Sequence, residues 1–252
     1  MAYNEFAYFY DELNSEADYD ALYRYVTDEL AAHGIRDGIL ADLGCGTGDL
    51  TLMLAQAGYD VIGIDRSEEM LSVLREKADE LDMTGRILLL RQDLLSLDLY
   101  GTIDACVCCL DSINYLTDPA ACRETFRRVY RALKPGGVFL FDVNTPEKLR
   151  EMDGQVFLDE DDDVFCVWRG SYEETERICT YGMDLFQRQG GLWRRSQEEH
   201  RQYAYSLDEL REFLQEAGFA SIRMFADRRP EPPAPGEQRV YWMAIREETT
   251  HA

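Results

Sequence analysis

Three glycines in alternate positions, Gly44, Gly46 and Gly48, form the stretch best suited to hold a ligand. They follow a short apolar run at residues 39–43 and precede a helical pattern, the order of a strand, a tight turn and a helix. Glycine has no Cβ, so its backbone adopts positive φ angles and a ligand can lie directly against it. The dinucleotide fingerprint Gly-x-Gly-x-x-Gly requires a glycine where Asp49 stands. Because an acid there would repel a pyrophosphate, the turn favours a ligand without phosphate groups.

Two acidic residues follow the next two strand-like apolar runs. Asp65 ends the run 61–64 and lies 21 positions after Gly44 (65 − 44). A carboxylate at this place can accept two hydrogen bonds from a ribose diol, although Asp65 could instead cap a helix beginning near Ser67. Asp93 follows the third apolar run in the same way. Since the carboxyl ends of parallel strands meet at one edge of a sheet, we expect both carboxylates to face the cleft beside the glycine turn.

The motif Ala41-Asp42-Leu43-Gly44-Cys45-Gly46-Thr47-Gly48 resembles the first motif of the class I S-adenosyl-L-methionine (AdoMet) dependent methyltransferases. Residues 111–116, Asp-Ser-Ile-Asn-Tyr-Leu, resemble the Asp-Ser-Leu-Asn-Tyr-Leu of a bacterial branch of small methyltransferases. The Leu-Lys-Pro-Gly-Gly turn at 133–137 is a further hallmark of that family. The resemblance covers about residues 3–146 and 206–246. It implies an α/β fold with a Rossmann-like, seven-stranded, mostly parallel sheet, and in-line methyl transfer that leaves S-adenosyl-L-homocysteine as product.

The resemblance also implies roles for single residues. The glycine turn would lie against the methionine part of AdoMet and Asp65 would bind its ribose. Asp93 would accept from the adenine amino group, while the backbone N–H of Leu94 meets the ring. In many small-molecule methyltransferases an aromatic N-terminal segment closes over the cofactor, so Tyr3 and Tyr10 are either such contacts or core-packing residues. The implied cofactor-binding residues are Tyr3, Tyr10, Asp42, Gly44, Cys45, Gly46, Asp65, Arg66, Met70, Asp93, Leu94, Leu110, Asp111 and Tyr115.

Residues 147–205 depart from the minimal fold. Strand-like patterns at 164–173, 177–187 and 192–205, with Gly190-Gly191 between the last two, predict an inserted antiparallel β subdomain. The acidic run at 159–163 is interpreted as a solvated loop. We therefore expect residues 1–146 and 206–252 to form the AdoMet-binding domain, and residues 147–205 to form a lid over the active site.

No residue declares itself as a catalytic base, and the candidates are Tyr10, Asn114, Asn144 and His200. Asn114 is alternatively a turn residue, and His200 an exposed strand histidine. Asn144 lies at the end of the fifth strand, in the sequence Asp-Val-Asn-Thr-Pro. This sequence differs from the Asn-Pro-Pro-Tyr of methylases that act on amide nitrogens or adenine. This difference argues against nucleic acid amino groups as acceptors and favours an unidentified small molecule.

The composition of the chain limits the partners and the cellular location that we expect. The formal net charge of −23 (26 − 49) disfavours contact with nucleic acid or anionic lipid. No run of apolar residues is long enough for a membrane span, and the N-terminal residues do not resemble a secretory signal. The seven cysteines fit a reducing cytoplasm and no metal site: Cys106, Cys108 and Cys109, which include one Cys-x-x-Cys spacing, lie within an apolar strand pattern and are interpreted as small buried hydrophobes. We expect a monomer or homodimer.

Three alternatives remain open on the sequence. The first is a noncatalytic AdoMet-binding regulatory protein, since no base is evident. The second is a transferase that uses a modified AdoMet donor. The third is a nucleotide-dependent oxidoreductase, because the same sheet and ribose-binding acid occur there.

Overall fold

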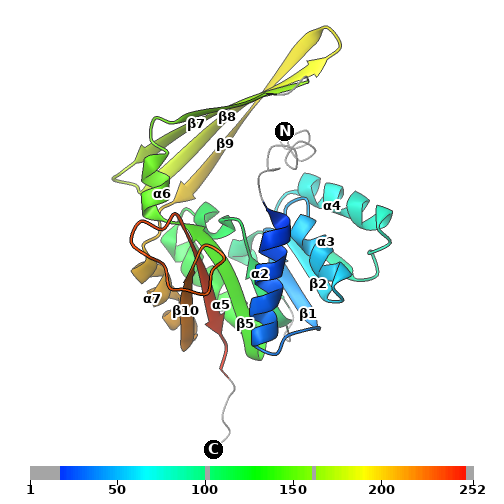
Figure 1. The fold of residues 1–252 in the computed structure, drawn as a ribbon, viewed down its shortest axis with the longest axis vertical. Coiled ribbons are helices and arrows are strands. Elements are labelled where there is room, and N and C mark those ends of the chain that lie inside the picture. Colours follow the sequence, from blue (N-terminus) through cyan, green and yellow to red (C-terminus); the bar gives the residue numbers. More distant parts are fainter. Residues whose placement is uncertain (1–17, 100–102, 161–162, 248–252) are drawn as a thin grey trace, which may run out of the picture.

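The computed structural model describes residues 18–99, 103–160 and 163–247 of the chain. One sheet of seven strands forms its centre, in the order β10-β11-β5-β4-β1-β2-β3 (Figure 1). The strands are β1 (Ile39–Leu43), β2 (Asp60–Asp65), β3 (Ile87–Arg91), β4 (Ile103–Cys108), β5 (Leu133–Asn144), β10 (Ser221–Ala226) and β11 (Arg239–Ile245). β11 runs antiparallel to both of its neighbours, whereas the pairs from β5 to β3 are parallel. The expected Rossmann-like, mostly parallel sheet is confirmed.

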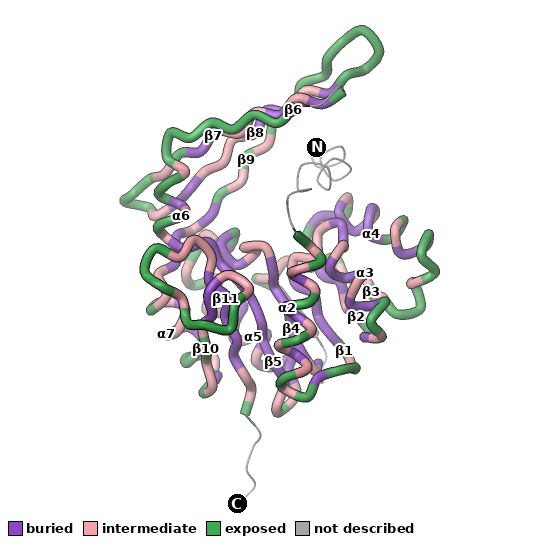
Figure 2. Tube along the Cα trace, in the orientation of Figure 1, coloured by how far each residue is buried: buried purple, intermediate pink, exposed green. Residues whose placement is uncertain are grey.

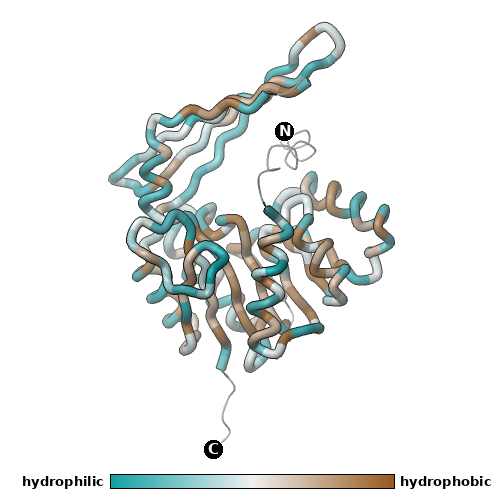
Figure 3. Tube along the Cα trace, in the orientation of Figure 1, coloured by the Kyte–Doolittle hydropathy of each residue, from teal (hydrophilic) through white to brown (hydrophobic). Residues whose placement is uncertain are grey.

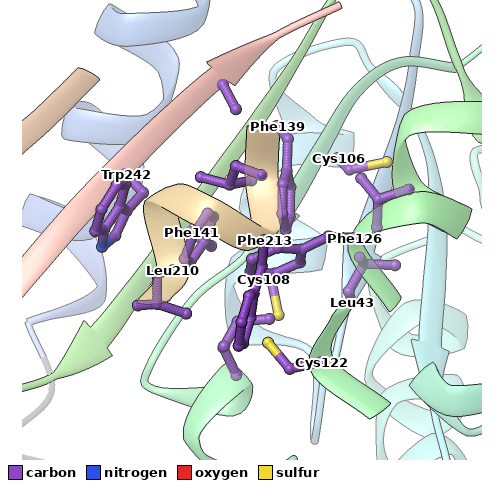
Figure 4. Packing of buried hydrophobic residues seen from close by; sticks show 14 of the residues in the cluster. Leu43, Cys106, Cys108, Cys122, Phe126, Phe139, Phe141, Leu210, Phe213 and Trp242 are labelled. Atoms are coloured by element: carbon purple, nitrogen blue, oxygen red, sulfur yellow. The ribbon is translucent and has the colours of Figure 1, made fainter. Parts of the chain in front are cut away.

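The sheet is buried on both faces because its strands alternate between two apolar clusters. In β5, Phe139 and Phe141 belong to one cluster, and Val138 and Leu140 to the other. Figure 4 shows the first cluster, in which the rings of Phe139 and Phe141 stack with centroids 4.7 Å apart. Cys106 and Cys108 of β4 also lie in this cluster, and their prediction as small buried hydrophobes is confirmed. A strand with apolar residues at successive positions therefore packs against helices on both faces of the sheet.

Helices cover the two faces of the sheet. α5 (Pro119–Ala132) and α7 (Leu207–Ala217) contribute Phe126 and Phe213 to the first cluster. α2 (Tyr19–Ala32) and α3 (Asp49–Gln56) contribute to the second cluster, and α4 (Glu68–Glu80) packs beside α3. Short helices η1 (Leu94–Ser96), η2 (Ser112–Tyr115) and α6 (Pro146–Glu151) follow β3, β4 and β5. Among the described residues, none of the helices has the length and apolar character needed to span a bilayer.

A second, antiparallel sheet lies between α6 and α7 and projects from the seven-stranded core (Figures 1 and 2). Its strands are β6 (Val156–Glu160), β7 (Val164–Glu173), β8 (Ile178–Gln189) and β9 (Leu192–Tyr203), in that order. The hairpin between β8 and β9 turns at Gly190, with φ at +64°. Figure 3 shows that β9 is largely hydrophilic, unlike the strands of the core.

Two predicted boundaries are wrong. The interpretation of residues 159–163 as a loop missed β6, which takes in Asp159 and Glu160. All five residues of this edge strand are exposed, and an exposed edge tolerates acids that a central strand would not. The segment expected as a turn at 133–137 belongs to β5, which begins at Leu133, the partner of Ile103 in β4.

Candidate active site

A cleft of about 670 Å³ opens at the carboxyl ends of β1, β2, β3 and β4. Of the residues predicted from the sequence, those on its wall are Gly44, Gly46, Asp65, Arg66, Met70, Asp93, Leu94, Leu110, Asp111, Tyr115 and His200. They come from four successive strand ends and from β9 of the second sheet. Tyr3 and Tyr10 lie outside the described residues.

The glycine turn forms the floor of this cleft. Gly44 and Gly46 have φ angles of +74° and +54°, which side chains with a Cβ rarely adopt. The N–H of Gly44 donates to the carbonyl of Ile64 at 2.8 Å, so the turn is tied to the end of β2. A Cβ on Gly44 would lie 2.7 Å from the hydroxyl oxygen of Ser112. Bare backbone at this position is therefore required by the packing of the loop after β4.

Asp65 stands beside the turn at the end of β2. Its Oδ2 accepts from the N–H of Gly46 at 3.0 Å, and its Oδ1 accepts from the N–H of Ser67 at 2.8 Å. The cap of α4 is Ser67, whose hydroxyl accepts from the N–H of Met70, so the capping alternative for Asp65 does not hold. Burial raises the pKa of Asp65, against the two backbone hydrogen bonds. Each carboxylate oxygen keeps a lone pair that a ribose hydroxyl can use.

Asp93 faces the cleft from the neighbouring strand. In the parallel register Asp65 pairs with Arg91, so Asp93 lies two residues beyond it at the same edge of the sheet. Its Oδ1 accepts from the N–H of Leu95 at 2.9 Å and caps η1. The other oxygen is the one available to an amino group in the cleft. The two acids are thus placed to bind opposite ends of one nucleoside.

Four predicted residues in the described part of the chain do not line this cleft: Asp42, Cys45, Asn114 and Asn144, of which Asn144 lines the second pocket described below. Asp42 is buried, and its Oδ2 accepts from the hydroxyl of Thr51 at 2.6 Å; burial raises its pKa to about 6. Cys45 points away toward Gly63 and contributes only its backbone to the turn. Asn114 is fully buried. Its amide nitrogen donates to the carbonyls of Asn144 and Tyr203, and its amide oxygen accepts from the N–H of Asn144, at 3.0 to 3.1 Å.

A network of charged and polar groups surrounds Asp111 at the base of the cleft, and the sequence did not predict it. Both Leu110 and Asp111 have positive φ angles, +55° and +54°, and their N–H groups donate to the carboxylate of Asp142 at 2.7 and 3.0 Å. The guanidinium of Arg239 donates to Asp142 and, at 2.7 Å, to Asp111. Gln202 of β9 also donates to Asp111, at 2.5 Å. The network therefore joins β5, β11, the loop after β4 and the second sheet.

The position of Arg239 in the sequence could have indicated that it lies at the site. It directly precedes the apolar run 240–244, and because β11 is antiparallel its start lies at the carboxyl ends of the parallel strands. Gln202 and Trp168 carry no such signal. Their places on the wall depend on how the second sheet sits against the core.

His200 lies where the cleft meets a second pocket of about 250 Å³. Its side chain is only 13% exposed, so the alternative of an exposed strand histidine is wrong. The imidazole packs edge-on to Tyr115, with ring centroids 5.9 Å apart, and beside Trp168. Asn144, the remaining catalytic candidate, lines the second pocket and donates to Gln202 at 3.2 Å. The arrangement brings a nucleoside-sized cleft and a small, partly aromatic pocket together.

Known proteins of this architecture identify the class. A family model described as a methyltransferase domain matches residues 40–137. The chain is 36% identical over 251 residues to YqeM, a methyltransferase-family protein of Bacillus subtilis (strain 168), with 99% of each chain covered. The chain belongs to the class I AdoMet-dependent methyltransferases, as the glycine motif implied, and AdoMet is its methyl donor.

Two solved structures extend the comparison. An S-adenosylmethionine-dependent methyltransferase from Clostridium acetobutylicum ATCC 824 superposes with a TM-score of 0.87 at 28% identity, covering 98% of this chain and 99% of that one. A sugar N-methyltransferase from Streptoalloteichus shares the fold, with a TM-score of 0.79 at 20% identity over 95% and 93% of the two chains. Nothing in these findings favours a noncatalytic regulator or a modified donor.

Proposed function

We propose that this methyltransferase acts on a small molecule that binds in the second pocket, with AdoMet in the main cleft. The observation that carries the proposal is the wall shared by the two spaces. Asp111, Tyr115, Trp168 and His200 line both, so an acceptor in the second pocket would lie next to a donor in the main cleft.

The main cleft fits AdoMet by its shape and its donor set. Asp65 would accept from the ribose hydroxyls and Asp93 from the adenine amino group, each in addition to its backbone hydrogen bonds. The bare turn at Gly44 and Gly46 would admit the methionine part. The bound donor supplies an activated methyl group. The protein then contributes chiefly the alignment of acceptor atom, methyl carbon and sulfur.

The second pocket favours a small acceptor. At about 250 Å³ it lies below the usual range of drug-sized sites, roughly 300–1,000 Å³. Phe157, Trp168 and Tyr181 provide aromatic walls, and Asn144 and Gln202 provide amide groups. These amides can orient a polar acceptor, while the net charge of −23 disfavours a nucleic acid. The sugar N-methyltransferase shows that this fold can act on a small polar substrate.

Residues 147–205 would then act as the lid of the site. From this segment, Trp168 of β7 and His200 of β9 line both the main cleft and the second pocket. Met70 and Val73 of α4 fall in the same buried apolar cluster as Met183 and Leu185 of β8, which supports a seat for the second sheet above the cleft.

A labelled-methyl screen tests the proposal. The purified protein is incubated with methyl-labelled AdoMet and either a low-molecular-weight metabolite fraction or a macromolecular fraction of a bacterial extract. Label transferred to a small molecule, and suppressed by excess S-adenosyl-L-homocysteine, is the expected result. Label that enters only protein or nucleic acid would contradict it. Trp168→Ala should reduce transfer to the small acceptor, whereas Trp193→Ala, at the exposed end of the second sheet, should not.

A further inference from the structure

The inner face of β9 carries an acid directly beside the histidine of the shared wall. Along this strand Glu198 and His200 are less exposed than the intervening Glu199, as expected of alternating faces. The Nε2 atom of His200 lies 3.4 Å from Oε2 of Glu198. Glu198 does not itself line the cleft or the second pocket, so it lies behind His200 as seen from the acceptor.

Glu198 is an unusual acid for a strand of this polarity. Its side chain is 6% exposed, and among the described residues neither of its carboxylate oxygens has a hydrogen-bond partner. It pairs across the strands with Met183, in an apolar cluster. A buried carboxylate is costly unless a group of opposite sign is near. The imidazole of His200 is the group in place to become that cation.

We propose that Glu198 and His200 act as a carboxylate–imidazole pair that removes a proton from the methyl acceptor. This inference rests on the proposed function, because it places the acceptor in the second pocket. In the structure Nε2 and Oε2 lie within ion-pair distance but form no hydrogen bond. Rotation of the ring would direct a protonated Nε2 at Glu198, and the basic nitrogen of the ring would then be Nδ1. Glu198 is a positioning residue, which holds this tautomer and stabilises the imidazolium formed during the reaction.

The lone pair of an acceptor oxygen or nitrogen forms the bond to the methyl carbon while the carbon–sulfur bond breaks, and that electron pair stays on sulfur. The proton of the acceptor O–H or N–H passes to Nδ1 of His200, and later to water. The chemical class of acceptor is therefore a hydroxyl compound or an amine that carries a proton, rather than a thioether or a tertiary amine.

Other described residues of the second pocket are poorly suited to this role. Asn144 and Gln202 carry amides, which are not bases. Asp111 is paired with Arg239. Tyrosine hydroxyls hold their proton at neutral pH, and burial raises the pKa of Tyr181 further. Of the described residues that line this pocket, His200 is the one with an imidazole, the side chain most often used as a general base.

The tautomer of His200 can be measured without knowing the acceptor. The chain has three histidines, His33, His200 and His251, so long-range ¹H–¹⁵N spectra of the imidazoles can be assigned with H200N. The wild-type protein should hold His200 as the Nε2–H tautomer, with or without S-adenosyl-L-homocysteine. Glu198→Met keeps the bulk and removes the acceptor, and should abolish this preference. Glu198→Gln should restore it, and Glu199→Met should leave it unchanged.

Kinetics with the acceptor found by the labelled-methyl screen complete the test. H200N should lower kcat by about 10²- to 10⁴-fold, the usual contribution of a general base. E198Q should lower kcat with little change in KM, although its tautomer is correct, because it lacks the charge. A tautomer of His200 that is the same in E198M and wild type would overturn the inference, as would transfer only to acceptors without a removable proton. The labelled-methyl screen separates the two proposals: label that enters only protein or nucleic acid contradicts the proposed function, whereas transfer to a small molecule with an unmoved tautomer in E198M contradicts only the pair.

Discussion

Asp65 and Gly46, from adjacent parallel strand ends, are joined by a hydrogen bond of 3.0 Å from the N–H of Gly46 to Oδ2 of Asp65. The acid at the end of β2 therefore fixes the glycine turn after β1 and faces the cleft at the same time. Asp93 caps η1 in a similar way while facing the same space. Both acids hold backbone N–H groups in place before any ligand arrives, which limits the ordering needed on binding.

Asp65→Ala should weaken the binding of S-adenosyl-L-homocysteine by about 1–3 kcal/mol, because buried hydrogen-bond donors lose their partner. Titration calorimetry measures the effect. Asp60→Ala, at the exposed opposite end of β2, is the matched control and should bind as the wild type does. Equal affinities for the two variants would show that the ribose is held elsewhere.

Asp93→Ala should remove recognition of the adenine amino group. We expect the affinity for S-adenosyl-L-homocysteine to fall by about 1.5–3 kcal/mol, the order of a hydrogen bond to a charged group. S-inosyl-L-homocysteine, which lacks that amino group, should bind the wild type more weakly and lose little further affinity in D93A. If D93A weakens both ligands equally, Asp93 supports the loop and does not contact the base.

Gly44→Ala should lower the free energy of unfolding by about 1–3 kcal/mol, because it places a Cβ at a left-handed φ and against Ser112. Gly85 has open space around its Cβ position and no positive φ, so Gly85→Ala should stay within about 0.5 kcal/mol of wild type. Denaturant unfolding compares the two. A neutral G44A would show that the turn relaxes without cost.

Arg239→Met should destabilise the fold by about 3–5 kcal/mol, since it leaves the buried carboxylate of Asp142 without its cation. Arg201→Met removes an exposed pair with Glu176 and should cost at most about 1 kcal/mol. Urea denaturation at neutral pH distinguishes these values. Similar losses in the two variants would mean that the network around Asp142 contributes little.

Asp42→Asn should stabilise the protein near neutral pH. Burial raises the pKa of Asp42 from 3.8 to about 6, so the folded state binds the proton more tightly than the unfolded state. Stability conferred by this group is therefore greatest below pH 4 and declines as the pH rises from about 4 to 6. The gain in D42N should reach about 1–3 kcal/mol at pH 7.5 and vanish near pH 4. A gain that is the same at both pH values would contradict this origin.

Much of the core could be predicted because local sequence signals agree with the fold. The glycine turn, Asp65 at the end of β2 and Asp93 just after β3 each act within a few residues of chain. The face of the site formed by the second sheet could not be predicted. Trp168 meets the cleft only through tertiary packing, and no local pattern encodes that.

Asn114 shows a second limit of local sequence signals. A polar residue in a loop after a strand is typical of a binding site or of a turn, and the sequence left both roles open for Asn114. In the structure its amide bridges the backbone of Asn144 and Tyr203, which lie 30 and 89 residues further along the chain. Such a long-range bridge leaves no trace in the local sequence.

A crystal structure with bound S-adenosyl-L-homocysteine tests the central claim most directly. The account predicts ribose hydroxyls within hydrogen-bond distance of Asp65, the adenine amino group at Asp93, and the sulfur end beside Gly44 and Gly46, pointing at the wall shared with the second pocket. A nucleoside bound elsewhere, or one that leaves both carboxylates without contact, would contradict it.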